Sequence, residues 1–239
     1  MTFYKKNYFT KNMVRFCFNR ASRVIVLSES LRNELRDLGY KGIVSIANTV
    51  MDDITPQASN KLNNEIVMIS NYHVDKGFYI ILDALKILKD LGREWNVSFF
   101  GDGDPSEFEK YANELGVQSF CNFSKPIFGM AKAQTIAASK ILVLPSFNEG
   151  QPLVILEAMQ LSTLIIASKV GYIKETLGKD YPFIIEPGNP LILAECIDVV
   201  MSTPHHRYYV RYLNDRFHTY FSKDAFEKNI NSLFEWPEA

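Results

Sequence analysis

The strongest constraint on this chain is a repeated alternation between short apolar runs and helical periodicity over residues 65–203. Several of the runs are continuously apolar, which is typical of strands buried on both faces. The runs, expected to be strands, are residues 65–70, 95–100, 119–123, 140–145, 163–168 and 182–186. The amphipathic stretches, expected to be helices, are residues 78–91, 105–115, 129–139, 152–161, 172–177 and 189–201. The alternation predicts an α/β fold with a Rossmann-like, doubly wound parallel sheet.

The first fifty residues do not follow this pattern. Residues 1–23 carry six cations and no acidic residue, with six Phe or Tyr residues interleaved. A strand at 23–28, a helix at 29–38 and a strand at 43–47 are expected to follow. Two strands are too few for an independent sheet with a covered apolar face. Residues 1–50, a helix-strand-helix-strand segment, are therefore interpreted as the remnant of a larger domain.

Two further segments flank the alternating region. Residues 51–64 are polar, contain Pro56 and are expected to be a linker. Residues 204–239 are rich in aromatic side chains and are expected to form C-terminal helices. Ser222 is a suitable N-cap for the last of these helices.

Composition narrows the class of protein. Lys and Arg total 26 and Asp and Glu total 27, so a basic, dedicated nucleic-acid binder is not expected. The three cysteines are far apart and odd in number, and the four histidines form no ligand motif. This predicts neither a disulfide framework nor a zinc site, and a reducing, cytoplasmic compartment. No apolar run reaches the roughly 18 residues that a membrane span needs.

The most informative segment for function is PSFNEGQPLVILEAMQ, residues 145–160. It follows a buried strand, at the end where open α/β sheets bind ligands. A short loop with Gly150 leads into a helix with Pro152 near its first turn, a position that proline favours. The unpaired N–H groups of such a helix start suit a phosphate.

Two glutamates, Glu149 and Glu157, flank this junction with seven residues between them. A carboxylate at Glu149 can accept hydrogen bonds from sugar hydroxyls, and Glu157 can accept both hydroxyls of a ribose. On spacing alone, a loop charge and a solvated helix residue explain the pair better. However, Glu157 lies inside the apolar stretch LVILEAM. A charge there is either buried with a partner or directed at a ligand.

The same segment resembles a known family. E-G-Q-P-L-V-I-L-E-A-M after a strand ending in L-P-S is similar to the E-x7-E signature of the family 4 (group 1) retaining glycosyltransferases. The other matches, in chain order, are VIVLSESLRNEL (24–35), SIANTV (45–50), NYHVDKG (71–77), SFFGDGDPSEF (98–108) and SKILVLPS (139–146). The resemblance covers nearly the whole chain.

The resemblance implies a GT-B fold, in which the acceptor binds an N-terminal Rossmann-like domain and the donor a C-terminal one. Residues 65–203 would then be the donor domain, and residues 1–50 the end of the acceptor domain. Residues 204–239 would pack back toward the N-terminal domain.

The resemblance also assigns roles. Glu149 would hold hydroxyls of the donor sugar, and Lys76 would neutralise the departing diphosphate; these two are the implied catalytic residues. Glu157 would bind the ribose. The other implied donor-binding residues are Asn71, Gly101, Asn148, Gly150, Gln151, Pro152, Leu153 and Val154. Without the resemblance, Lys76 would be taken as a surface lysine and Gly101 as an ordinary turn glycine.

Asp102-Gly103-Asp104 matches the D-x-D pattern that binds a metal–nucleotide complex in glycosyltransferases of the other major fold. Here it occupies the family's G-D-G turn and is followed by Pro105 and Glu107 at a helix start, where acidic residues favour the dipole. We therefore predict a turn and a helix cap, with no metal and no cofactor.

The chain departs from the family pattern at several positions. Asn71 stands where the family usually has a phosphate-binding arginine, and Lys125 or His73 is a candidate substitute. The other departures are Asn48-Thr49-Val50, Phe123-Ser124-Lys125, Ser162, Leu164 and Gly171-Tyr172. These changes are typical of a divergent member or of a copy under relaxed constraint.

The leading hypothesis is a retaining enzyme that moves a hexose from a UDP-, GDP- or similar nucleotide sugar to a glycan or lipid-linked acceptor. Bacterial surface polysaccharide (O-antigen, capsule or lipopolysaccharide) is the setting that the resemblance implies. The alternative is a truncated or partner-dependent nucleotide-sugar-binding module without independent activity. A nicotinamide-dependent enzyme is disfavoured, because no G-x-G-x-x-G follows the first donor-domain strand.

The basic, aromatic N-terminus has two interpretations. It is either a surface that touches anionic lipid, giving peripheral association with the cytoplasmic membrane face, or the last helix of a missing domain or partner chain. We favour the second, which predicts self-association of the isolated chain.

Overall fold

The computed structural model describes residues 8–46, 65–203 and 206–234, and the chain divides into two compact units. Unit 1 consists of residues 1–52 and 218–239, and unit 2 consists of residues 53–217. The expected linker at 51–64 and the Asn48-Thr49-Val50 segment lie outside the described residues.

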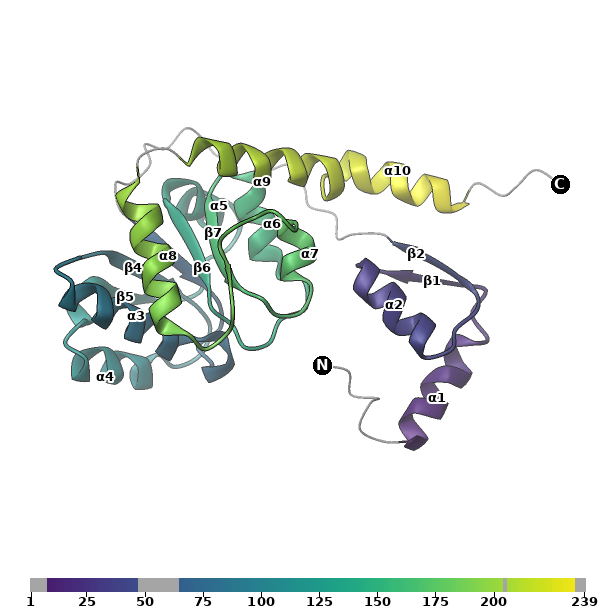
Figure 1. The fold of residues 1–239 in the computed structure, drawn as a ribbon, viewed down its shortest axis with the longest axis horizontal. Helices are drawn as coiled ribbons and strands as arrows, with labels where there is room; N and C mark the ends of the chain where they lie inside the picture. The colour runs from purple at the N-terminus through teal and green to yellow at the C-terminus, as the bar shows by residue number, and fades with distance from the viewer. Residues whose placement is uncertain (1–7, 47–64, 204–205, 235–239) are drawn as a thin grey trace. The chain divides into compact units, whose positions relative to one another are not determined.

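Unit 2 is built on six parallel strands in the order β5-β4-β3-β6-β7-β8 (Figure 1). The strands are β3 (Glu65–Ile69), β4 (Asn96–Phe100), β5 (Cys121–Ser124), β6 (Ile141–Leu144), β7 (Leu164–Ser168) and β8 (Ile184–Ile185). From the β3–β6 pair, the chain winds outward in both directions. The predicted doubly wound parallel sheet is confirmed, and the β3–β6 pair marks the point where such sheets bind ligands.

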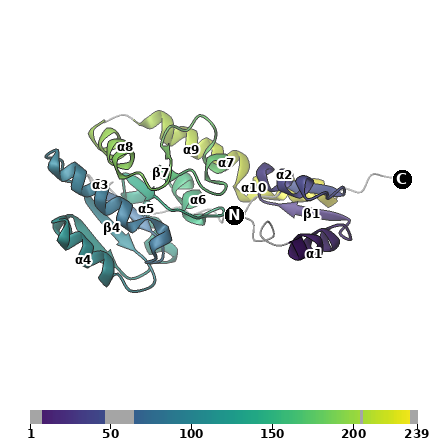
Figure 2. The same ribbon diagram turned by 60° about the horizontal axis from the view of Figure 1, so that its bottom comes forward.

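Helices lie on both sides of this sheet (Figures 1 and 2). They are α3 (Phe78–Asp90), α4 (Ser106–Glu114), α5 (Gly129–Ala138), α6 (Leu153–Gln160), α7 (Ile173–Leu177), α8 (Pro190–Ser202) and α9 (Arg207–Tyr220). Helix α3 packs against α4 and α8, whereas α5 packs against α6. Right-handed crossovers place these two groups on opposite faces.

The burial of unit 2 explains its sequence pattern. Every residue of β6 and β7 is buried, so apart from Ser168 both strands are apolar rather than alternating. On the other side of the β3–β6 pair, Phe78 packs between Phe99 and Phe108, with ring centroids 5.6 and 4.7 Å away. The carboxyl ends of the strands are thus held by a well-packed core.

Two predicted strands differ from those observed. Residues 118–120 form the short 3₁₀ helix η3 (Gln118–Phe120), so the strand expected at 119–123 begins at Cys121. The amide of Phe120 donates to the carbonyl of Val117 at 3.0 Å instead of joining the ladder. At 182–186, Ile184–Ile185 alone forms the strand, because β8 pairs with β7 at the edge of the sheet through two residue pairs.

Unit 1 contains the parallel pair β1 (Arg23–Val26) and β2 (Ile43–Ile46), with α1 (Tyr8–Phe18) and α2 (Glu29–Asp37). The Ser28 hydroxyl caps α2 by accepting from the amide of Leu31 at 3.1 Å. Val26, Leu35, Leu38 and Tyr40 form its buried core. In contrast, Ile25 and Ile43 are 49% and 55% exposed, so the sheet is apolar on a face that the described residues leave open.

The last two helices belong mainly to different units. In α9, Arg216 donates to the carbonyls of Thr176 and Glu175 at 2.7 Å, so this helix packs on unit 2. Helix α10 (Lys223–Phe234) belongs to unit 1. The Ser222 hydroxyl accepts from the amide of Ala225 at 3.3 Å, which confirms the predicted N-cap.

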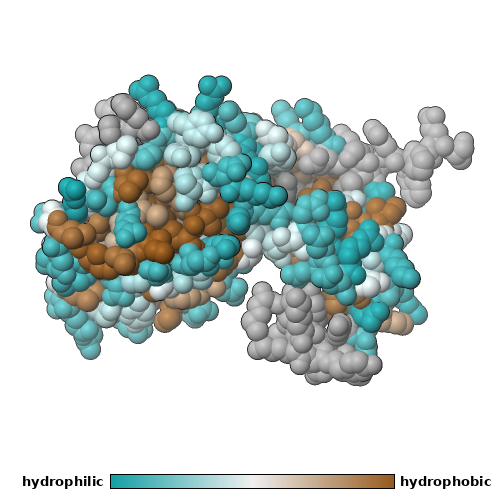
Figure 3. All heavy atoms as spheres, in the orientation of Figure 1, coloured by the Kyte–Doolittle hydropathy of each residue, from teal (hydrophilic) through white to brown (hydrophobic). Residues whose placement is uncertain are grey.

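The surface of unit 2 carries an apolar region. Apolar side chains gather where Figure 1 draws α3 and α8 (Figure 3), and exposed side chains of this part of the chain include Leu91, Leu191 and Val199. Among the described residues, no helix combines the length and apolar character that crossing a bilayer requires.

Candidate functional site

The loop after β3 is fixed by backbone packing at the carboxyl edge of the sheet. The amide of Tyr72 donates to the carbonyl of Asp102 at 2.7 Å. Gly77 has φ +81°, and a Cβ there would lie 2.2 Å from the carbonyl oxygen of Pro145. At Gly101, a Cβ would lie 2.1 Å from the carbonyl oxygen of Ser70. These glycines let the loops after β3, β4 and β6 touch one another directly.

Tyr72 anchors this loop, and the sequence analysis did not identify it. Its hydroxyl lies 2.8 Å from the carbonyl of Ser124 and accepts from the amide of the same residue at 3.0 Å. It also lies 3.1 Å from the carbonyl of Phe99. Burial raises the pKa of the Tyr72 phenol. Tyr72 thus ties the ends of β3, β4 and β5 together through a neutral hydroxyl.

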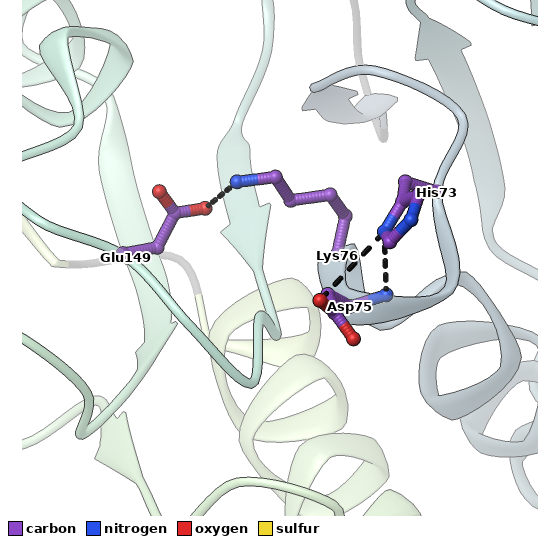
Figure 4. A network of polar contacts seen from close by, with 4 residues as sticks. All are labelled: His73, Asp75, Lys76 and Glu149. Atoms are coloured by element: carbon purple, nitrogen blue, oxygen red, sulfur yellow. Dashed lines mark hydrogen bonds and ion pairs between the residues drawn. The ribbon is translucent and has the colours of Figure 1, made fainter. Parts of the chain in front are cut away.

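The two implied catalytic residues lie together in the structure. Lys76 ends the 3₁₀ helix η2 (Val74–Lys76), and its Nζ donates to Oε1 of Glu149 at 2.8 Å (Figure 4). The side chains are 26% and 11% exposed. Beside this ion pair, the amide of Phe147 donates to the carbonyl of Asp75 at 2.8 Å. Residues 73 positions apart are therefore held at one place on the carboxyl edge.

The start of α6 is open to its surroundings. The helix begins at Leu153, one residue after the expected start, and Pro152 is its N-cap with extended backbone angles. Leu153 is exposed and Val154 is buried. A Cβ at Gly150 would meet nothing within 4 Å. The loop before this helix therefore has open space at Gly150, next to a helix start of the kind that favours a phosphate.

The segment that follows β7 packs against the loop that carries Glu149. Gly171 has φ +53°, and a Cβ there would lie 2.0 Å from the carbonyl oxygen of Glu149. The amide of Tyr172 donates to the carbonyl of Gly150 at 3.1 Å. The side-chain Nε2 of Gln151 donates to the hydroxyl of Thr176 at 3.4 Å. The loop that carries Glu149 is thus set by its contacts with the segment after β7.

Glu157 is paired with a residue that the sequence analysis did not single out. The Nζ of Lys132, in the first turn of α5, donates to Oε1 of Glu157 at 2.9 Å and lies 2.6 Å from Oε2. A cation in a first turn opposes the helix dipole, and that misplacement is the signal in the sequence that a carboxylate holds it. Of the two alternatives for a charge in LVILEAM, the structure shows a partly buried charge with a partner.

The remaining predicted site residues have exposed side chains. Asn71 and Asn148 are exposed. His73 is also exposed, and its Nδ1 accepts from the amide of Asp75 at 3.3 Å. Lys125 is exposed just after β5.

The D-x-D motif forms a bend just before α4, and the N-cap of that helix is Pro105, which makes no side-chain cap hydrogen bond. One carboxylate oxygen of Asp104 accepts from the Ser106 amide at 3.0 Å and from the Ser106 hydroxyl at 2.5 Å, at the start of α4. These hydrogen bonds, that of the hydroxyl above all, lower the pKa of Asp104. Over the described ranges, His, Cys, Asp and Glu side chains form no group of three or more suited to a metal.

Comparison with known proteins shows which family has this sequence pattern and fold. The family model described as "Glycosyl transferases group 1" matches residues 63–203. The chain belongs to this family. Its fold, a six-stranded parallel Rossmann-like sheet with a small two-stranded sheet, is that of GT-B glycosyltransferases.

Two relatives are distant in sequence and longer than this chain. An uncharacterized glycosyltransferase of Haemophilus influenzae is 25% identical over 194 residues, 76% of this chain and 52% of its own length. The putative teichuronic acid biosynthesis glycosyltransferase TuaC of Bacillus subtilis is 27% identical over 123 residues, 52% of this chain and 29% of its own. This chain thus spans about half the length of the first of these relatives.

A solved structure gives the same fold. Anabaena Alr3699/HepE in complex with UDP-glucose superposes with a TM-score of 0.80 at 19% identity. The match covers 95% of this chain and 68% of the other.

Proposed function

We propose that this chain binds a nucleotide diphosphate sugar in unit 2 and carries the donor half of a retaining hexosyltransferase. The Lys76–Glu149 pair carries this proposal, because it sets a cation and a carboxylate 2.8 Å apart beside the open start of α6. A diphosphate needs the cation and the amides, and a sugar needs the carboxylate. The UDP-glucose bound to the structurally similar HepE supports the ligand class.

In the bound state, the amides of residues 150–154 and the Lys76 ammonium would face the diphosphate. Glu149 would turn from Lys76 to accept from sugar hydroxyls, and Glu157 would accept from the ribose. Asn71 and Asn148, exposed at the same edge, would contribute side-chain hydrogen bonds. Gly101 already approaches Ser70 closely, so its loop would present backbone rather than side chain to the nucleotide.

The reaction follows from these charges. The bond between the anomeric carbon and the diphosphate oxygen lengthens, and negative charge grows on the departing diphosphate, where Lys76 and the helix start stabilise it. The acceptor hydroxyl forms the new bond on the face that the diphosphate leaves, so configuration is retained. Its proton passes to the departing diphosphate oxygen. These steps require no cofactor and no metal.

We further propose that the acceptor is a glycan or a lipid-linked sugar in bacterial surface polysaccharide assembly. The teichuronic acid pathway named for TuaC supports this class. Arg20, two residues after the end of α1, lies 4.2 Å from the centroid of the Phe16 ring, and Met13 and Phe16 on α1 are exposed. This basic and apolar surface suits either anionic lipid at the cytoplasmic membrane face or the rest of an N-terminal acceptor domain.

A second candidate is a partner-dependent donor-binding module. The exposed Ile25 and Ile43 favour it, because a parallel sheet normally has both faces covered. In this proposal, residues 1–50 belong with an acceptor domain, residues 51–64 link it to the donor domain, and residues 65–203 bind the donor. The C-terminal helices of residues 204–239 begin on unit 2 with α9, and only α10 belongs with unit 1. The acceptor domain would come from further chain or from a second polypeptide.

Calorimetry with UDP, GDP and their glucose and mannose conjugates, followed by an assay for sugar transfer or hydrolysis, separates the two candidates. Binding with turnover by this chain supports the enzyme, and binding without turnover supports the module. Absence of binding to every nucleotide, with Glu157→Ala indistinguishable from the parent, would rule out both.

A further inference from the structure

Lys132 occupies an electrostatically unfavourable place unless something holds it. It is the fourth residue of α5, in a first turn that contains no acidic residue. The positive end of the helix dipole repels a cation there. Its stabilising partner is Glu157, which lies 25 positions further along the chain on a different helix, α6.

The contact is close and partly shielded from water. The Lys132 ammonium donates to Oε1 of Glu157 at 2.9 Å and lies 2.6 Å from Oε2. The side chains are 21% and 14% exposed. Oε2 is buried, and no described residue makes a hydrogen bond of good geometry with it. This oxygen therefore keeps acceptor capacity for a hydroxyl group once the lysine chain shifts.

The site therefore has two carboxylates with one lysine each, Glu149 with Lys76 and Glu157 with Lys132. A nucleotide diphosphate brings further negative charge to the start of α6. An uncompensated carboxylate at low local dielectric would repel it over several ångströms. A nucleoside brings the same ribose without that charge.

We infer that Lys132 is the counter-charge of Glu157 in the donor site, and that it allows a ribose-binding carboxylate to tolerate a nucleoside diphosphate. This inference rests on the proposed function, in which Glu157 faces the ribose. Lys132 is a positioning residue, since it acts through Glu157 rather than on the reacting atoms.

The test compares UDP with uridine by calorimetry on the full chain. For Lys132→Gln, we expect the dissociation constant for UDP to rise about tenfold and that for uridine to change less than about twofold. The UDP effect should shrink as salt rises from about 50 to 500 mM. Lys132→Arg should restore UDP binding. The matched control is Lys86→Gln, which removes a lysine of an exposed pair with Asp90 on α3 and should change neither constant.

A double variant separates charge from packing. In Glu157→Gln, the further change Lys132→Gln should cost UDP affinity little, because no carboxylate is left to neutralise. Circular dichroism and thermal melting check the fold. If Lys132→Gln does not fold, Lys132→Arg and the double variant carry the comparison, and an arginine that fails to retain UDP binding overturns the inference.

Other results of the same measurements would also overturn the inference. Equal loss for UDP and uridine, or unchanged UDP affinity, overturns the counter-charge role while leaving the donor site intact. A parent chain that binds neither UDP nor GDP removes the proposed function, and the inference falls with it.

Discussion

In unit 2 every residue of β6 and β7 is buried, whereas in unit 1 Ile25 and Ile43 are about half exposed. Both units use parallel strands. Helices lie on both sides of the unit 2 sheet (Figure 2), whereas the described residues leave apolar side chains exposed on the unit 1 sheet. A parallel sheet is stable when its crossovers cover both faces. The difference explains why the candidate site lies in unit 2, where loops rest on a completed core and can be held in one geometry.

The largest effect should come from breaking that core. Phe78→Ala removes a fully buried ring from a cluster with Phe99 and Phe108, so we expect a loss of about 3–5 kcal/mol in the free energy of unfolding. Ile43→Ala in unit 1 should cost less than about 0.5 kcal/mol, because the side chain is exposed. Urea unfolding measures both, and similar losses would contradict the comparison.

The glycines of the site provide the next test. Gly77→Ala forces φ +81° on a residue with a Cβ and meets the Pro145 carbonyl, so we expect a loss of about 1–3 kcal/mol in stability and weaker nucleotide binding. Gly150→Ala adds its Cβ to open space. It should leave the thermal midpoint unchanged and still weaken UDP binding if the amides of this loop meet the diphosphate. A Gly150→Ala chain that binds UDP normally would contradict that placement.

Glu149→Gln should act on the sugar rather than on the nucleotide. The change keeps the shape of the side chain but removes a charged acceptor, so UDP-glucose should lose about tenfold in affinity relative to UDP. Calorimetry with the two ligands gives this ratio directly. The matched control is Glu186→Gln, in the exposed pair with Lys169 after β8, and an equal change in that variant would argue against a specific role.

The smallest effect concerns the D-x-D turn. The Ser106 hydroxyl lowers the pKa of Asp104 below its ordinary value of 3.8. The stabilisation by this hydrogen bond is therefore fully present above pH 3.8, and it is lost as the pH falls through the lower pKa that Asp104 has in the folded chain. Ser106→Ala should reduce stability slightly at pH 6 and by progressively less as the pH falls below 3.8. Thermal melts across this range test the sign, and a difference that grows toward low pH would refute it.

Much of unit 2 was predictable because its signals are local. Continuous apolar runs and amphipathic stretches placed each strand and helix to within a few residues, as for β6 and α6. The strand expected at 119–123 was wrong at its start, since the composition of Gln118-Ser119-Phe120 does not distinguish a 3₁₀ turn from a ladder. Lys76, Glu149 and Glu157 were found through the family pattern, and their binding roles stay predictions.

The sequence by itself determined the order of elements, the apolar character of the central strands and the residues that carry charge near them. Only the tertiary structure decided which charges meet. Lys132 and Glu157 are 25 positions apart, and Lys76 and Glu149 are 73 apart. The Tyr72 hydroxyl bonds to Ser124, 52 positions away. Such contacts depend on how crossovers bring loops to one edge of the sheet, and no local periodicity encodes that distance.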